Sequence, residues 1–281
     1  MEHGRLWYRI HPGPEARPAV IVLHGGPGCP SDYLHPLSAL ADMATVVFYD
    51  QLGCGRSTRQ VAEAALTLSG FAADLQTLLD HLQITSIVLL GHSFGALLAL
   101  EHQRHHPHSA SALVLASPLV ATPDWMSDMA ALIAALPEPY QTDICKPAHD
   151  PAYQAAETYF YRTHFCNLDP WPPLLLAAAE EMAVSPAYHL MWGPAEFSQT
   201  GTLAGVDRSG VLETLRCPVL FTCGSHDEAR PETLKRYADR VTHGHVSVLD
   251  GGTHCVHLEQ TADFLHVVSA FLTRPAGDDL L

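Results

Sequence analysis

The stretch from residue 86 to residue 98, SIVLLGHSFGALL, constrains the fold of this chain more than any other. An apolar, partly β-branched run ends at Gly91 and a helical pattern begins at Phe94, so Ser93 stands between a strand and a helix. A serine on so tight a turn needs neighbours without side chains, because the two backbone segments approach closely. Gly91 and Gly95 supply them in the pattern G-x-S-x-G. Such a turn exposes a serine hydroxyl beside the first N–H groups of a helix, and we interpret Ser93 as a nucleophile.

Short apolar runs alternate with helical patterns along most of the chain. Apolar runs of this length, separated by helices, are typical of a mostly parallel sheet covered by helices on both faces. The helix predicted at residues 68–82 has Ser69 as its expected N-terminal cap. Strands are predicted at residues 6–10, 19–23, 45–49, 87–90, 112–116, 218–223 and 245–249, and further core helices at residues 231–238 and 262–272.

The alternation stops between residues 119 and 205. This stretch is rich in alanine, proline and aromatic residues, and it has helical patterns near residues 125–136, 152–164 and 174–183 but no buried strand. We predict a core of residues 1–118 and 206–281, with residues 119–205 inserted as a helical cap over the sheet. The aromatic residues that could line a substrate pocket, or equally fill the interior of the cap, are Phe160, Tyr161, Trp171, Trp192 and Phe197.

Charge and cysteine usage argue against several classes of function. The net charge of −15 disfavours nucleic acids and anionic membrane surfaces as partners, and no stretch has the length of a membrane span. The seven cysteines are scattered without a C-x-x-C pair, which indicates reduced thiols and a cytoplasmic location. The histidine-rich stretch EHQRHHPH, residues 101–108, is interpreted as a solvated helix end rather than a metal site. We therefore expect neither a metal nor a cofactor.

A serine nucleophile needs a base, and the base needs a carboxylate that orients it. Asp227 follows the strand predicted at residues 218–223, and His254 follows the next strand. The order serine, aspartate, histidine, each at the end of a later strand, is that of hydrolases built on an α/β sheet. We predict Ser93, Asp227 and His254 as a catalytic triad.

The oxyanion of an acyl-transfer reaction needs two backbone donors aimed at the developing charge. One is expected to be the N–H of Phe94, the residue after the nucleophile. The glycine-rich loop HGGPG, residues 24–28, allows close approach of the backbone and is expected to supply the other. We assign that second donor to Gly26.

Four motifs together resemble the proline iminopeptidase family of α/β-hydrolases: HGGPG (24–28), DQLGCGRS (50–57), GHSFG (91–95) and GPAEF (193–197). The resemblance extends from about residue 19 to residue 272. It implies an α/β-hydrolase fold with a helical cap, and hydrolysis of an amide or peptide bond after an N-terminal residue with a free α-amine. Small peptides and amino-acid amides or esters are the substrates it implies.

The resemblance also implies a site for the substrate amine. Glu196 lies in the G-P-x-E-F element, Glu228 directly follows the triad aspartate, and Tyr188 precedes Glu196 by eight residues. An ammonium group entering a partly desolvated pocket needs compensating negative charge, and two carboxylates supply it while disfavouring N-blocked substrates.

Two other functions remain open at this stage. The turn that carries Ser93, here called the elbow, has the sequence GHSFGA (91–96). His92 and Ala96 at these positions are common in esterases. An esterase, lactonase or acyl transferase that retains the amine site is therefore the alternative hypothesis. A non-catalytic ligand-binding protein is a third, and the complete triad argues against it.

Overall fold

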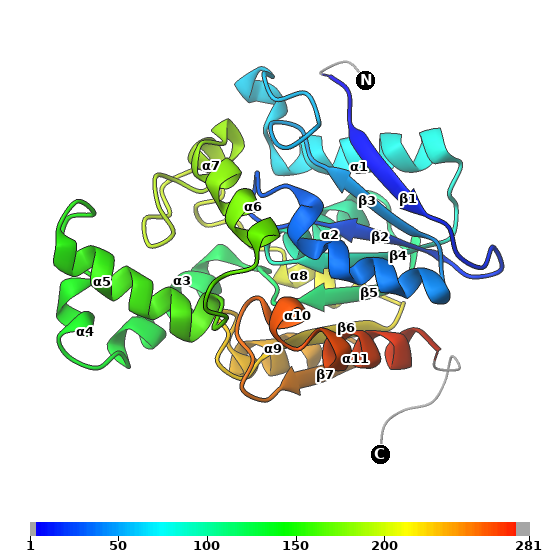
Figure 1. The fold of residues 1–281 in the computed structure, drawn as a ribbon. Coiled ribbons are helices and arrows are strands. Elements are labelled where there is room, and N and C mark those ends of the chain that lie inside the picture. Colours follow the sequence, from blue (N-terminus) through cyan, green and yellow to red (C-terminus); the bar gives the residue numbers. More distant parts are fainter. Residues whose placement is uncertain (1–3, 274–281) are drawn as a thin grey trace.

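The computed structural model describes residues 4–273, and its centre is a seven-stranded sheet in the order β1-β3-β2-β4-β5-β6-β7 (Figure 1). β1 (Trp7–His11) pairs antiparallel with β3 (Val46–Asp50), whereas all other neighbouring strands are parallel. The mostly parallel sheet is thus confirmed, with one antiparallel edge. The other strands are β2 (Ala19–Leu23), β4 (Ile87–His92), β5 (Ala110–Ala116), β6 (Val219–Gly224) and β7 (Gly244–Leu249).

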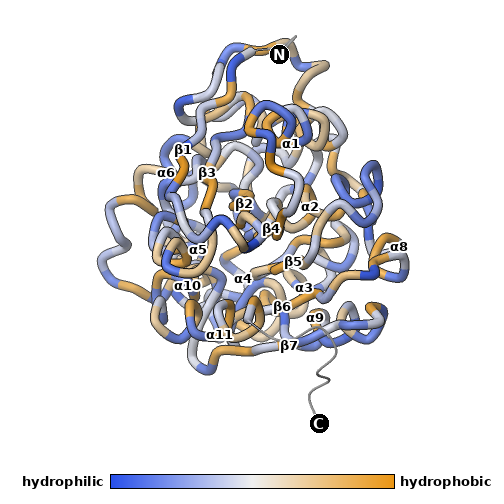
Figure 2. The backbone as a smooth tube through the Cα atoms, turned by 90° about the vertical axis from the view of Figure 1, so that its right-hand side faces the viewer, coloured by the Kyte–Doolittle hydropathy of each residue, from blue (hydrophilic) through white to orange (hydrophobic). Residues whose placement is uncertain are grey.

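The sheet separates two apolar cores, because successive side chains of a strand point to opposite faces. In β2, Ile21 belongs to one core, and Val20 and Val22 belong to the other. Hydrophobic segments lie along central strands such as β5 and β6 (Figure 2). The first core includes α1 (Leu68–Leu82), α2 (Phe94–His105), α8 (Ser209–Leu212) and α9 (Pro231–Ala238), and the second includes the 3₁₀ helix η1 (Ser31–Asp42), α10 (Val256–Glu259) and α11 (Thr261–Thr273).

The N-terminus of α1 differs from the prediction. Its cap is Thr67, whose side chain accepts a hydrogen bond of 3.0 Å from the N–H of Gly70. Ser69 is already inside the first turn, so its assignment as the cap was wrong. A cap precedes the first helical residue, and Leu68, which is buried, is that residue.

The histidine-rich end of α2 is only partly solvated, so this expectation also needs correction. His102 is completely buried, and its Nε2 lies 2.9 Å from the side-chain oxygen of Gln76 in α1. His102 is buried because α2 packs against α1 at this position. Within residues 4–273, no histidine, cysteine and carboxylate side chains gather in a group suited to a metal ion.

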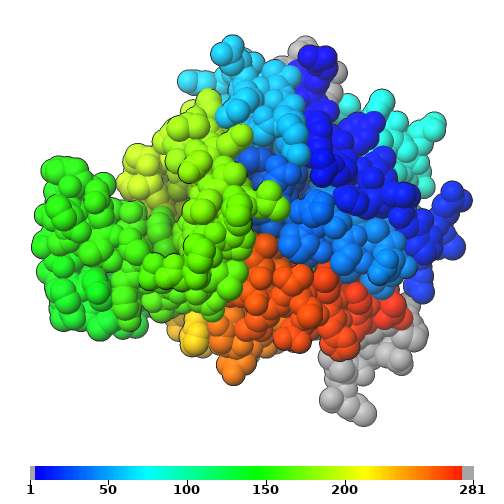
Figure 3. Space-filling model, in the orientation of Figure 1, coloured from blue at the N-terminus to red at the C-terminus, as the bar shows by residue number. Residues whose placement is uncertain are grey.

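The helices between β5 and α8 gather on one side of the molecule, coloured green in Figures 1 and 3. The two ends of this insertion meet, since the N–H of Thr122 donates to Val206 O (2.8 Å) and that of Arg208 donates to Val120 O (3.1 Å). This pairing supports the proposal that residues 119–205 form a cap. Its helices are α3 (Thr122–Ala134), α4 (Tyr140–Asp143), α5 (Pro151–Phe160), the π-helical turn η3 (Tyr161–Phe165), α6 (Pro173–Ala183) and α7 (Pro186–Met191).

All seven cysteines are free thiols. No helix in the described range, residues 4–273, combines the length and the hydropathy needed to cross a membrane.

Candidate active site

Ser93 occupies the sharp turn between β4 and α2 with φ 54° and ψ −121°, a strained conformation for a residue with a side chain. Its N–H donates to Ala116 O at 3.0 Å, which anchors the turn to β5. The glycines of the motif are required by packing. A Cβ on Gly91 would lie 2.4 Å from Gly95 O, and a Cβ on Gly95 would lie 2.1 Å from Leu23 O. The motif therefore requires glycine at both positions because the strand and helix backbones are in direct contact.

Asp227 and His254, from the loops after β6 and β7, are joined by a hydrogen bond of 2.9 Å between Oδ1 and Nδ1. Both side chains are almost completely buried. Ser117 Oγ donates to the other carboxylate oxygen at 2.6 Å, and the N–H of Ala229 donates to Oδ1 at 2.8 Å. These bonds hold the carboxylate toward the imidazole. The sequence analysis missed Ser117, although its place directly after β5, beside the elbow strand, is a detectable signal.

The turn η3 of the insertion holds the loop of His254. The N–H of His254 donates to His164 O at 2.9 Å, and the N–H of Cys255 donates to Phe165 O at 2.8 Å. His164 Nδ1 in turn lies 2.8 Å from His226 O, in the loop after β6. The ring of Phe165 stacks on the His254 imidazole with 5.6 Å between the centroids. One turn of the insertion thus contacts both loops of the Asp–His pair.

A cavity of about 50 Å³ lies beside Ser93 and His254. Of the five aromatic candidates, all within the described residues, only Trp192 lines this cavity, whereas Phe160 is completely buried in the apolar core. Core and insertion both contribute to the walls. The lining includes Gly26, Trp125, Phe165, Leu175, Met182, Glu196 and Glu228.

The cavity contains two carboxyl groups without a fixed cation. Tyr188 donates a hydrogen bond of 3.1 Å to Glu196 Oε2. Glu228 is 2% exposed, and its Oε1 has no hydrogen-bond partner in the described part of the chain. No ion pair within residues 4–273 involves either glutamate. Burial raises the pKa of both, that of Glu228 to about 8. The arrangement suits a positively charged ligand.

The same carboxyl groups act on His254. Burial disfavours the charged imidazole, but the negative charges of Asp227, Glu228 and Glu196 outweigh this effect and raise the pKa of His254 to about 9. The ring therefore binds its proton more tightly than a free imidazole does.

The predicted oxyanion donors are the N–H groups of Gly26 and Phe94. Gly26 lines the cavity, and Phe94 opens α2, where an N–H has no intrahelical acceptor. His24 accepts from the Gln51 N–H at Nε2 (2.9 Å) and donates from Nδ1 to Gly25 O (3.0 Å). Because the peptide group is planar, fixing the Gly25 carbonyl also fixes the direction of the Gly26 N–H.

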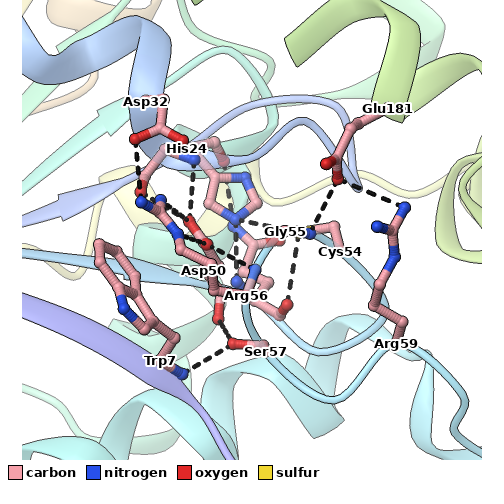
Figure 4. Close-up of polar contacts among 12 residues, drawn as sticks. Trp7, His24, Asp32, Asp50, Cys54, Gly55, Arg56, Ser57, Arg59 and Glu181 are labelled. Carbon is pink, nitrogen blue, oxygen red and sulfur yellow. Dashed lines mark hydrogen bonds and ion pairs between the residues drawn. The ribbon is translucent and has the colours of Figure 1, made fainter. Parts of the chain in front are cut away.

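Another buried carboxylate, Asp50 at the end of β3, pairs with a cation, Arg56 (Figure 4). Arg56 Nε lies 2.9 Å from Asp50 Oδ2, and Ser31 Oγ donates to Oδ1 at 2.6 Å. The guanidinium carbon of Arg56 lies 3.4 Å from the ring centroid of Trp7. Burial acts to raise the pKa of Asp50, but the bonds from Arg56 and Ser31 hold it below its usual range. This network gives the DQLGCGRS motif a structural explanation.

Comparison with known proteins agrees with this architecture. The family model for the alpha/beta hydrolase fold matches residues 18–261. The proline iminopeptidase of Heyndrickxia coagulans is 33% identical over 258 residues, covering 90% of each chain. The chain belongs to the proline iminopeptidase family of α/β-hydrolases.

Two solved structures similar to this chain have the same fold. The proline iminopeptidase of Mycobacterium smegmatis matches with a TM-score of 0.90 and 31% identity, over 96% of this chain and 94% of that one. VinJ matches with a TM-score of 0.90 and 34% identity, over 96% and 95%. The predicted fold and family are confirmed, and the protein is a serine-type hydrolase.

Proposed function

We propose that the protein hydrolyses the amide or peptide bond that follows an N-terminal residue with a free α-amine. The observation that carries the proposal is the buried, unpartnered carboxyl oxygen of Glu228 in the cavity beside Ser93. Glu196, held by Tyr188, lines the same cavity from the insertion. A substrate ammonium bound between the two glutamates would supply the missing positive charge. The names of the relatives, proline iminopeptidases, support this substrate class, and small peptides and amino-acid amides or esters belong to it.

The mechanism follows the chemistry of a serine triad. Ser93 Oγ attacks the substrate carbonyl while His254 accepts its proton, and Asp227 holds the imidazole in the required tautomer. The N–H groups of Gly26 and Phe94 bind the oxyanion. His254 then gives the proton to the leaving amine, and water releases the acyl group from Ser93.

The substrate charge and the catalytic base are coupled in this site. Asp227 contributes most to the raised pKa of His254, and Glu228 and Glu196 add to it when they are ionised. An ammonium group between the glutamates offsets their field and lowers the pKa of His254 toward the working pH. A general base acts best when its pKa lies near that pH. A substrate with a blocked amine lacks this effect.

The test compares kcat/KM for an amino-acid amide, its N-acetyl derivative and a simple acyl ester. Loss of the charged bonds is expected to lower kcat/KM for the N-acetyl amide at least about tenfold. Equal turnover of the free and acetylated amides, with faster turnover of the ester, would favour an esterase, lactonase or acyl transferase instead. A fluorophosphonate probe should label Ser93, and absence of labelling would support a non-catalytic protein.

We also infer a reducing, cytoplasmic location. The observation that supports it is that all seven cysteines are free thiols, which is typical of proteins from reducing compartments. The net charge of −15 agrees with a small-molecule substrate rather than a nucleic acid or a membrane surface as the partner.

A further inference from the structure

His92, the residue before Ser93, is buried and takes no part in the mechanism described above. Its Nδ1 lies 2.8 Å from Tyr33 Oη, and its Nε2 lies 3.0 Å from the carbonyl oxygen of His254. Tyr33 Oη also accepts a hydrogen bond of 2.9 Å from the N–H of Gly25. Three consecutive bonds therefore connect the glycine-rich loop, the elbow and the backbone of the proposed base.

The donors and acceptors along these bonds have one consistent order. A carbonyl oxygen only accepts, so Nε2 of His92 carries the hydrogen, and Nδ1 of the neutral ring accepts from Tyr33. The Tyr33 hydroxyl gives its single hydrogen to His92 and accepts from Gly25. Burial lowers the pKa of His92 and raises the pKa of Tyr33, which keeps both groups in the neutral forms that this order requires.

We propose that Tyr33 and His92 are positioning residues that hold the glycine-rich loop at the distance from Ser93 needed for the Gly26 N–H to bind the oxyanion. Gly25 lies close to both the Tyr33 hydroxyl and the nucleophile. A Cβ added to Gly25 would be 3.0 Å from Tyr33 Oη and 3.2 Å from Ser93 Cβ. The Gly25–Tyr33 bond sets how far the loop stands from the elbow. This inference rests on the proposed serine-hydrolase mechanism.

The oxyanion donors act mainly in the transition state. Loss of the hydrogen bonds that Tyr33 and His92 make should therefore affect kcat more than KM. Removal of one oxyanion donor costs about 10²–10³ in kcat. Tyr33→Phe displaces the donor rather than deleting it, because the loop loses one bond and keeps the bond from His24 to Gly25 O. We expect kcat to fall about tenfold to a hundredfold, with KM changed less than about threefold.

The experiment measures the full-length Tyr33→Phe variant with a small uncharged acyl ester, which avoids the amine site. A second readout is the affinity of an alkylboronic acid, which forms a tetrahedral adduct with a serine and so mimics the oxyanion. Its affinity should fall by the same factor as kcat/KM, since both depend on the same donors. A purely structural role of Tyr33 would lower thermal stability without this parallel loss.

Tyr237→Phe is the matched control. Tyr237 is also buried, its hydroxyl donates to Asp124 Oδ2 at 2.7 Å, and it does not line the cavity. This variant should keep kcat and boronic-acid affinity. His92→Asn places an amide oxygen where it can still accept from Tyr33, so its loss in kcat should be smaller than that of Tyr33→Phe.

Two results would overturn the proposed positioning role of Tyr33 and His92. One is a kcat for Tyr33→Phe within about twofold of the wild type, and the other is a loss of kcat/KM that the boronic-acid affinity does not follow. If Tyr33→Phe does not fold, His92→Phe is measured in the same way and must show the parallel loss. The proposed function is tested separately, by turnover of the amide and ester in the wild-type enzyme.

Discussion

Asp50 and Glu228 are both buried carboxylic acids, and their surroundings differ in one respect: Asp50 has a counter-ion and Glu228 has none. Asp50 is 0% exposed, pairs with Arg56 and accepts further bonds, and its pKa is lowered. Glu228 is 2% exposed, has one carboxyl oxygen without a partner among the described residues, and has a pKa raised to about 8.

The difference indicates which carboxyl group stabilises the fold and which awaits a ligand. A buried polar group without a hydrogen-bond partner costs about 1–3 kcal/mol, so it persists where function requires it. The loop itself is able to satisfy a carboxylate, since the adjacent Asp227 accepts bonds from His254, Ser117 and Ala229. Glu228 is therefore unpaired because of its position in the cavity.

The largest expected effect comes from removing the nucleophile while both carboxyl groups stay in place. Ser93→Ala should lower kcat for an amino-acid amide by about 10⁶, as for other triad serines. Its unfolding midpoint should stay close to that of the wild type, because the side chain is partly exposed. A variant that keeps more than about a hundredth of the wild-type rate would show that this cavity is not the catalytic site.

The next effect concerns the paired carboxylate. Asp50→Asn should lower the free energy of unfolding by about 3 kcal/mol, since Arg56 loses its buried partner and keeps only the half-exposed Asp32, 3.1 Å away. We take the lower end of the range for buried pairs because 33% of the Arg56 side chain is exposed. Urea unfolding measures the loss, and kcat of the folded variant should stay within about threefold of the wild type. Unchanged stability with a large loss of kcat would reverse the roles of the two sites.

Removing the unpaired carboxyl group of Glu228 should have the opposite effect on stability from removing that of Asp50: it should stabilise the folded protein. The pKa of Glu228 is raised to about 8 from its ordinary value of 4.5, so the folded state binds more protons between these values. The free energy of unfolding should therefore fall as the pH rises from about 4.5 to about 8. Glu228→Gln should remove this part of the slope and raise stability at pH 8 by about 1–3 kcal/mol. Thermal unfolding at several pH values checks both, and identical slopes in the two proteins would contradict the account.

The part of this arrangement that could be predicted from the sequence depends on local rules. Gly91 and Gly95 are required by contacts inside one strand–turn–helix unit, so the elbow is legible in a few residues. Asp227 and His254 follow strands, and the carboxyl ends of neighbouring parallel strands meet at one edge of a sheet. The order of strands along the chain was therefore enough to predict that Asp227 and His254 lie near the same edge of the sheet.

The rest depends on contacts between distant segments. His92 binds the backbone of His254, 162 residues away, and the turn η3 holds that same loop from the insertion. Neither contact leaves a pattern in the sequence near the residues involved. Whether Trp192 or Phe160 reaches the cavity likewise depends on how the inserted helices pack. Helix pattern alone does not distinguish a pocket wall from an apolar core.

The most direct test of the central claim measures kcat/KM for two substrates, an amino-acid amide with a free α-amine and a small uncharged ester, in the wild type and in Glu196→Gln and Glu228→Gln. Each substitution is nearly isosteric and removes one charged partner of the ammonium, worth about 1.5–3 kcal/mol. The account predicts that kcat/KM for the amide falls about tenfold to a hundredfold in each variant while kcat/KM for the ester changes little. Equal losses for both substrates, or no loss for either, would contradict the amine site and the aminopeptidase function with it.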